Sequence, residues 1–198
     1  MAAKNRQQKM REIEYAATVL ISREGINAAS FRRVAAASGY SLGSIQNFFP
    51  NQQKLFLGIM DYIVSSGRQW AKESGLFAGG MRAEDFFRYS EQMLPHDEAR
   101  AHELRAWDSL VRLGSVDPAL QQKAESLLSE NYEIMETVFE FMKADGIFRK
   151  DLDTSYAAGI YYTFLEGLAR HSMILERKYT GEKMRKIMQE FVQSNFMR

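Results

Sequence analysis

Apolar residues recur every three or four positions along most of the chain, which is the spacing of one face of an α-helix. No segment alternates apolar and polar residues between hairpin turns, as an exposed strand would. The three prolines, Pro50, Pro95 and Pro118, fall where one periodic segment gives way to the next, and proline is tolerated at helix starts but not inside helices. The pattern therefore predicts an all-α fold of about nine helices.

The first sixty residues predict one ordinary helix, two short ones and the start of a long one. The first runs from about residue 6 to residue 23 and ends at Gly25, with an apolar stripe of Ile13, Ala16, Ala17, Leu20 and Ile21. Ser30 and Ser41 can each cap a short helix, and Gly39 between them can take the positive φ of a tight turn. Asn51 can cap the long fourth helix. Ile45 and Phe49, four residues apart, are expected to face inward and fix the second short helix, and the inward positions of the fourth helix are Leu55, Phe56, Ile59, Met60 and Ile63.

The remainder predicts five more helices after a glycine-rich connection. Residues 74–80, which include three glycines, mark the end of the first module. Beyond them the helices are predicted at roughly 83–94, 97–113, 118–144, 152–175 and 181–196. The expected organisation is a first domain of residues 1–50, a connector helix of residues 51–73 and a second domain of residues 74–198.

Charge is distributed unevenly over these modules. Residues 1–60 carry eight basic and three acidic side chains, whereas the rest of the chain has a net charge of −4. No acidic residue occurs between Glu24 and Asp61, although the chain has 25 of them in 198 positions. A surface free of carboxylates can lie against a polyanion, and two short helices around a glycine describe a helix-turn-helix. Double-stranded DNA is therefore the first partner to consider.

Other features restrict the remaining classes. The chain has no cysteine, which excludes disulfides, thiolate catalysis and cysteine-based zinc sites. Its polar, basic first residues do not resemble a signal peptide, and no run approaches the ~18 apolar residues of a membrane span, so a cytoplasmic protein without membrane contact is expected.

Enzyme motifs are missing as well. The sequence contains no HExxH, P-loop, GxSxG or GxGxxG motif, and it predicts no cofactor. One cluster of acidic and histidine residues is a candidate metal site, but exposed helix residues are the favoured interpretation: His96, Asp97, Glu98, His102 and Glu103. A helical protein-interaction module and a bundle enzyme without DNA binding remain as alternatives.

A family resemblance covers residues 13–56. It rests on Ala16-Ala17, Leu20, Gly25, Ser30, Val34-Ala35, Ser38-Gly39-Tyr40-Ser41, Gly43-Ser44-Ile45, Phe48-Phe49 and Leu55. This segment resembles the DNA-binding domain of the tetracycline-repressor (TetR) family. The family usually has tyrosine at the position of Gln46 and lysine at that of Gln52, and members resembling the choline-responsive betaine regulators also lack that tyrosine. The resemblance implies a repressor that binds a palindromic operator as a homodimer and is released by a small-molecule effector.

Residue chemistry assigns roles within the DNA-binding segment. Gln46 and Asn47 can each present a paired donor and acceptor to adenine, and Arg32 can reach a guanine edge or a phosphate. Phe48 can touch a thymine methyl group or pack internally. The basic residues Lys4, Arg6, Lys9 and Arg11 either follow the DNA backbone or minor groove, or form a solvated tail. The candidate DNA-binding residues are Ser30, Arg32, Arg33, Ser41, Leu42, Gly43, Ser44, Gln46, Asn47, Phe48, Asn51 and Lys54.

The resemblance also implies a ligand-binding and dimerising body. Gly159, Thr163 and Gly167 recur every four residues and form a narrow face on which two helices can approach closely. With them, the candidate dimer residues are Met184, Ile187, Met188 and Phe191; either set can instead be internal core. The candidate residues for an apolar or aromatic effector are Trp107, Phe139, Tyr162 and Glu166. For Glu166, an ion pair with Arg170 four residues on is an equal alternative to contact with a cationic ligand.

Overall fold

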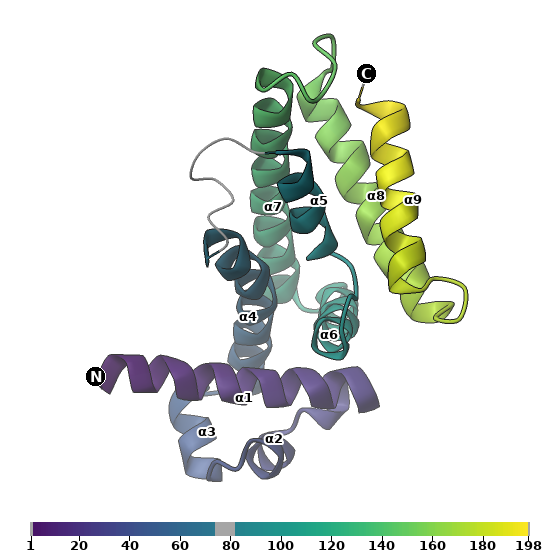
Figure 1. Ribbon diagram of the computed structural model, residues 1–198. Coiled ribbons are helices and arrows are strands. Elements are labelled where there is room, and N and C mark those ends of the chain that lie inside the picture. Colours follow the sequence, from purple (N-terminus) through teal and green to yellow (C-terminus); the bar gives the residue numbers. More distant parts are fainter. Residues whose placement is uncertain (1, 74–81, 198) are drawn as a thin grey trace. The chain divides into compact units, whose positions relative to one another are not determined.

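The structure, a computed structural model, describes residues 2–73 and 82–197, and it is helical almost throughout (Figure 1). The predicted all-α fold is confirmed: the described residues form nine α-helices, one 3-10 helix and a single isolated β-bridge between Phe148 and Met197. The predicted connection at residues 74–80 lies outside the described residues. Within those residues, no helix combines the length and the apolar character that crossing a membrane requires.

The helices agree with the predicted segments to within four residues at each end. Their bounds are α1 Ala2–Glu24, α2 Phe31–Ser38, α3 Leu42–Phe48, α4 Gln52–Glu73, α5 Ala83–Glu91, α6 Glu98–Gly114, α7 Pro118–Ala144, α8 Thr154–Ile174 and α9 Gly181–Asn195. The 3-10 helix, Ile26–Ala28, was not predicted.

The chain folds into two compact units, and each unit consists of two separate stretches of the sequence. Unit 1 comprises Met1–Ser66 and His102–Leu127, and unit 2 comprises Gly67–Ala101 and Leu128–Arg198. Helices α4, α6 and α7 each contribute residues to both units. The predicted division at residues 50 and 73 stays a prediction, because compactness does not by itself define a functional domain.

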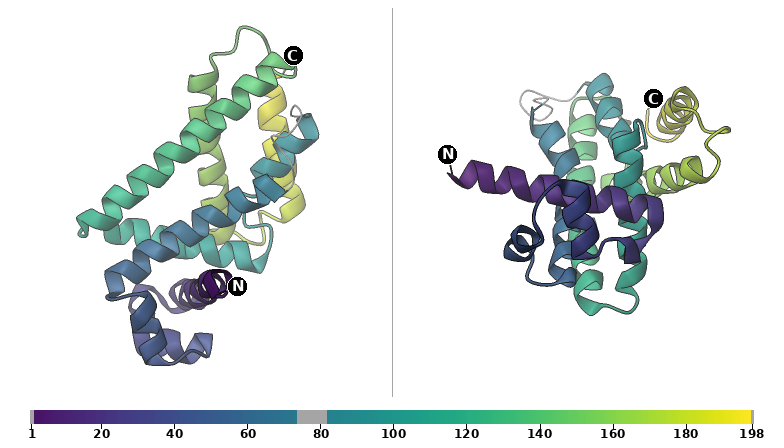
Figure 2. Two further views of the ribbon diagram at one scale, coloured as in Figure 1. Left: turned by 90° about the vertical axis from the view of Figure 1, so that its left-hand side faces the viewer. Right: turned by 90° about the horizontal axis from the view of Figure 1, so that it is seen from below.

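Unit 1 is built around an apolar core shared by α1 to α4 and the adjoining parts of α6 and α7. Figures 1 and 2 show α1 lying alongside α2, α3 and the first turns of α4. The inward positions predicted for α3 and α4 are confirmed, since Ile45, Phe49 and the five residues predicted to face inward on α4 are all buried. Ala16 and Leu20 of the predicted α1 stripe are only partly buried. Further core residues come from later in the chain: Ala106, Leu110, Leu120, Ala124 and Leu127.

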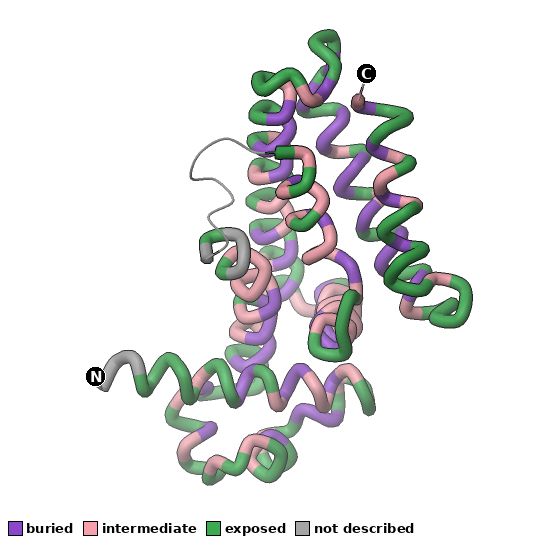
Figure 3. The backbone as a smooth tube through the Cα atoms, in the orientation of Figure 1, coloured by how far each residue is buried: buried purple, intermediate pink, exposed green. Residues whose placement is uncertain are grey.

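Unit 2 has an aromatic core. Buried stripes run along the inner sides of α7, α8 and α9 (Figure 3). Phe86 of α5 contacts Phe139, Phe148 and Tyr161, with ring centroids 5.3–5.7 Å apart. Phe191 of α9 stacks on Phe164 of α8 at 3.9 Å, with the two rings nearly parallel. These contacts join α5, α7, α8 and α9 into one packed body.

Local signals at the helix starts agree with the predicted caps, with one difference. The Ser41 side chain accepts a hydrogen bond from the Ser44 amide at 3.2 Å, and that of Asn51 accepts one from the Lys54 amide at 2.9 Å. Ser30 occupies the position before α2, but its side chain makes no capping hydrogen bond. Gly39 ends α2 with a φ of 74°, the left-handed conformation that favours glycine in the turn.

Candidate nucleic-acid interface

Helices α2 and α3 form the helix-turn-helix that the sequence predicted. They are eight and seven residues long and are joined by the turn at Gly39. Figure 1 shows both lying on the same side of α1. The anchoring of α3 is apolar, because Ile45 is 0% exposed and Phe49, which follows the helix, is 4% exposed. A short helix held by two buried side chains presents its opposite face to solvent.

The outward face of α3 carries small and amide side chains. Leu42, Gly43, Gln46 and Asn47 are exposed, and Ser44 is partly buried. Positions 42, 43, 46 and 47 share one side of a helix at the i, i+4 spacing. The face has no formal charge, so it suits hydrogen bonding to base edges rather than nonspecific attraction to phosphate.

Side chains at the flanking helix starts can reach phosphate. Ser30, Arg32, Ser41, Asn51 and Lys54 are all exposed. The capping bonds of Ser41 and Asn51 use side-chain oxygen atoms as acceptors, which leaves the Ser41 hydroxyl proton and the Asn51 amide protons available as donors. Capping and phosphate binding are therefore compatible at these two positions.

Arg33 differs from the other basic residues of this surface. Its guanidinium donates to the Glu24 carboxylate at 2.5 Å, with both side chains about half exposed. This hydrogen bond raises the pKa of Arg33 and lowers the pKa of Glu24. Because its charge is already balanced, Arg33 would have to exchange Glu24 for a phosphate to contact DNA.

Contacts from α1 to the helix-turn-helix were missed at the sequence level. The Tyr40 hydroxyl in the turn donates to the Glu12 carboxylate, which also accepts from Gln8 at 3.1 Å. The Tyr40 hydrogen bond is the main reason that the pKa of Glu12 is lowered. The Arg6 guanidinium lies 5.3 Å from the centre of the half-buried Phe48 ring. Such contacts join residues 28 and 42 positions apart, which helical periodicity does not reveal.

The interior of unit 1 contains polar groups that the sequence interpretation placed on the surface. His102 and Glu103 are each 6% exposed, so the expectation of exposed helix residues is wrong for these two, although His96, Asp97 and Glu98 are exposed. The side chains of Ser22 and His102 share a hydrogen bond of 2.8 Å, and Ser66 donates to Glu103 at 3.1 Å. They are buried because α6 packs into unit 1. No group of three or more potential ligands in the described part of the chain could hold a metal ion.

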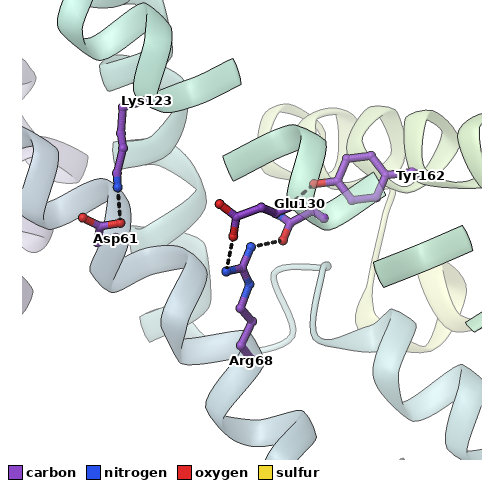
Figure 4. A network of polar contacts seen from close by, with 6 residues as sticks. Asp61, Arg68, Lys123, Glu130 and Tyr162 are labelled. Carbon is purple, nitrogen blue, oxygen red and sulfur yellow. Dashed lines mark hydrogen bonds and ion pairs between the residues drawn. The ribbon is translucent and has the colours of Figure 1, made fainter. Parts of the chain in front are cut away.

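A buried carboxyl group lies between α1 and α4. Glu14 is 4% exposed, and a Cβ atom on Gly58 would lie 2.8 Å from its Oε1. Burial, with a smaller contribution from the charge of Asp61, raises the pKa of Glu14 to about 8. Asp61 itself is paired with Lys123 of α7 at 2.5 Å (Figure 4). At neutral pH the Glu14 carboxyl is therefore mostly protonated.

The four candidate effector residues differ in the unit to which they belong and in how far they are buried. Trp107 packs partly buried against the core of unit 1, whereas the other three belong to unit 2. Phe139 is enclosed in the aromatic core, and Glu166 is exposed. The Tyr162 hydroxyl accepts from Asn131 at 3.2 Å, and its ring lies 4.5 Å from that of Tyr132.

A polar network in unit 2 extends this tyrosine pair. Arg68 near the end of α4 donates to Glu130 at 2.7 Å and to Asn131 at 3.1 Å, and Asn131 donates in turn to Tyr162 (Figure 4). The network joins α4, α7 and α8 within this unit, and the sequence had not singled out Arg68, Glu130 or Asn131.

The candidate dimer residues also divide into two groups. Thr163 and Gly167 are exposed, and Gly159 is partly buried with nothing within 4 Å of an added Cβ atom. Exposed apolar side chains continue this face of α8: Tyr156 at 70%, Ile160 at 40% and Ile174 at 72%. On α9, Ile187 and Phe191 are partly buried, but Met184 and Met188 lie in the core of unit 2, because they are on the side of α9 that faces the chain's own interior. An interface with another molecule would therefore use α8 and the outer side of α9 rather than these two methionines.

Comparison with known proteins finds a similarity to a protein family in the segment that contains α2 and α3. Residues 15–59 match the model of the bacterial regulatory proteins of the tetR family. The HTH-type transcriptional regulator PksA of Bacillus subtilis (strain 168) is 18% identical over 188 residues, which span 95% of this chain and 90% of that protein.

Solved structures resemble the whole chain. A transcriptional regulator from Saccharomonospora viridis, solved in complex with choline, has a TM-score of 0.83 at 20% identity over 97% of this chain and 99% of its own. A TetR-family regulator from Rhodococcus sp. has a TM-score of 0.78 at 18% identity, over 94% of this chain and 98% of its own. Residues 15–59 thus resemble the tetR family, and the likeness to these solved structures shows a shared fold. The finer likeness to betaine regulators stays a prediction.

Proposed function

We propose that this protein is a transcriptional regulator that binds a palindromic DNA operator as a homodimer. The observation that carries the proposal is the outward face of α3, where Gln46 and Asn47 stand exposed on a helix anchored by Ile45 and Phe49. This face lies within the segment that matches the tetR family. In the proposed arrangement, residues 1–50 read DNA, residues 51–73 connect, and residues 74–198 bind the effector and the partner chain, in a protein of the cytoplasm.

Sequence reading would come from the two amides of α3. Each can bind adenine through paired hydrogen bonds in the major groove. Gly43 and Ser44 are small enough for the backbone to approach the bases. Arg32 and Lys54 would bind phosphate or, for Arg32, a guanine edge.

A second copy would supply the other half of the interface. One such module reads only a few base pairs, and two modules about one helical turn apart read a palindrome. The exposed stripe of α8, from Tyr156 through Thr163 and Gly167 to Ile174, supports self-association, because four apolar or small positions follow one helix face.

An effector would act on unit 2 and release DNA. The Tyr132–Tyr162 pair offers aromatic rings and hydroxyls, and Glu166 lies one turn from Tyr162 on the same helix. This chemistry suits an aromatic compound or an organic cation. Since one structural neighbour is in complex with choline, choline is the first compound to test. The effector would lower DNA affinity only if it binds the released state more tightly than the DNA-bound state.

The decisive experiment selects DNA from a randomised duplex library with the full-length protein and measures affinity by fluorescence anisotropy. The expected result is a palindromic site bound by two chains. Gln46→Ala should relax base preference at one position of each half-site, while Lys54→Ala, the matched control, should weaken binding to every sequence and reduce the salt slope by about 1 per bound chain. Failure to enrich any site would favour a protein-interaction module, and equal losses for specific and scrambled duplexes in Gln46→Ala would exclude base reading by that residue.

The effector proposal has its own measurement. Thermal unfolding of the full chain with choline and with neutral aromatic compounds of similar size should identify the class that raises the melting temperature. Mass spectrometry of small molecules that co-purify with the protein would test the same point without a chosen ligand. A compound that stabilises the protein without changing its DNA affinity would contradict the regulatory role.

A further inference from the structure

Arg6, in the second turn of α1, is placed beside the recognition helix although it lies 36 residues before that helix begins. Its guanidinium carbon is 5.3 Å from the centroid of the Phe48 ring, within the range of a cation–π contact. Phe48 is the last residue of α3, and it is half-buried with its ring 6.4 Å from that of the buried Phe49. The Phe48 side chain thus packs against the core of unit 1 and also contacts the guanidinium of Arg6.

The helical state of α1 fixes this position. The helix begins at Ala2, so Arg6 belongs to a continuous helix rather than to a free tail. Further along, Glu12 of α1 accepts the Tyr40 hydroxyl from the turn between α2 and α3. Two side-chain contacts therefore hold α1 against the helix-turn-helix, one at the turn and one at the end of α3. Figure 1 and both views of Figure 2 show α1 packed along this module.

The charge of Arg6 has no acidic partner among the described residues. Arg33, by contrast, is neutralised by Glu24 at 2.5 Å. A cation stacked on an aromatic ring keeps its edge N–H groups free for other acceptors, and the planar guanidinium can donate two parallel hydrogen bonds to a phosphate. Arg6 is also an exposed residue, so an incoming phosphate can approach its side chain.

We propose that Arg6, held on the ring of Phe48, is a DNA phosphate contact of this protein and that Phe48 is its positioning residue. The inference rests on the proposed DNA-binding function and adds a contact from outside the matched residues 15–59. It adds positive charge to a surface on which Gln52 stands at the position where the resembled family usually has lysine. It also assigns Phe48 a role in supporting Arg6 instead of touching a thymine methyl group.

The test measures binding of the full-length protein to its selected duplex and to a scrambled duplex between 50 and 200 mM salt. Arg6→Ala should reduce the slope of log K against log salt by about 0.9 per bound chain, or about 1.8 for the dimer, on both duplexes, because each chain loses one phosphate contact and its released counterion. A slope change of about 1.8 corresponds to about a 12-fold smaller change in affinity over this salt range. Arg23→Ala removes the same charge from the far end of the same helix and should leave the slope unchanged.

Phe48 variants separate positioning from charge. Phe48→Leu keeps an apolar side chain at the half-buried position but removes the ring, and it should reduce the salt slope in the same direction as Arg6→Ala. In the double variant the two effects should not add, since both act on one contact. Arg6→Lys should restore part of the slope, because lysine keeps the charge without the planar fork.

Several results would overturn the inference. These are an unchanged slope in Arg6→Ala, additive losses in the double variant, or a loss confined to the selected duplex, which would indicate a base contact. Absence of any selected duplex for the wild-type protein would instead refute the proposed function. In that case the scrambled duplex still tests Arg6, because phosphate binding does not depend on sequence.

Discussion

The buried carboxyl of Glu14 predicts that unit 1 loses stability as the pH rises. The group is 4% exposed between α1 and α4, and its pKa is about 8 in the folded chain against 4.5 as the ordinary value. Between these two values the folded state holds a proton that the unfolded state has released. A raised carboxyl pKa therefore gives stability that is complete below pH 4.5 and is lost progressively as the pH rises toward 8.

The size of the effect follows from proton linkage. One extra proton in the folded state lowers the free energy of unfolding by about 1.4 kcal/mol per pH unit over this interval. Relative to acidic conditions, the accumulated loss at pH 7 is about 3 kcal/mol. Glu14→Gln keeps the shape of the protonated side chain but does not ionise. The variant should match the wild type near pH 4.5 and exceed its free energy of unfolding by about 3 kcal/mol at pH 7.

Urea unfolding of the full chain in a Trp70→Phe background provides the measurement. The chain has two tryptophans, so the remaining signal comes from Trp107, which packs against the core of unit 1. Glu12→Gln is the matched control, because the exposed Glu12 has a lowered pKa. A lowered carboxyl pKa gives stability above the ordinary value that is lost as the pH falls, the opposite sign. Parallel pH profiles for wild type and Glu14→Gln between pH 5 and 8 would refute the reasoning.

Two further changes test local packing and capping. Gly58→Ala should destabilise the protein by about 1–2 kcal/mol although alanine favours helix, because the added Cβ atom would lie 2.8 Å from the Glu14 carboxyl oxygen. In urea unfolding the part of the cost that comes from Glu14 should disappear in a Glu14→Ala background, whereas the part from the Phe49 ring, 3.0 Å from the added Cβ atom, should remain; an equal cost in both backgrounds would exclude the clash with Glu14. Ser41→Ala should cost about 1 kcal/mol, since the Ser41 side chain caps α3. Ser30→Ala should change stability little, because Ser30 makes no capping bond; equal shifts in melting temperature for the two serine variants would contradict the assignment.

The sequence predicted the helices well because their signals are local. The apolar spacing of α4 identified all five buried positions among the α4 residues whose side chains the structure describes, and the serine, glycine and asparagine signals located α2, α3 and the start of α4. The exposed amide face of α3 followed from the same spacing, once Ile45 and Phe49 were turned inward. These features depend on neighbours within one or two helical turns.

Contacts between distant segments were not predictable in this way. His102 lies near the start of a predicted helix, in a polar stretch of the sequence. It is nevertheless buried in unit 1, where its side chain shares a hydrogen bond with that of Ser22, 80 residues earlier. Periodicity correctly predicted that Met184 and Met188 lie on a buried face of α9. It does not say whether the same chain or a partner chain covers that face. The Arg6–Phe48 contact similarly required two elements to be placed in space.

The composition of unit 1 has a consequence for exchanging DNA-reading modules between proteins. Its core includes Ala106, Leu110, Leu120, Ala124 and Leu127, which enter the unit from beyond residue 101. A chimera that takes residues 1–73 from this protein would place Ile59 and Met60 in a core completed by side chains that evolved with another protein. A transplantable cassette would have to be discontinuous, carrying residues 1–66 together with 102–127. Recombination that transfers only one of the two stretches would therefore leave the core of unit 1 incomplete.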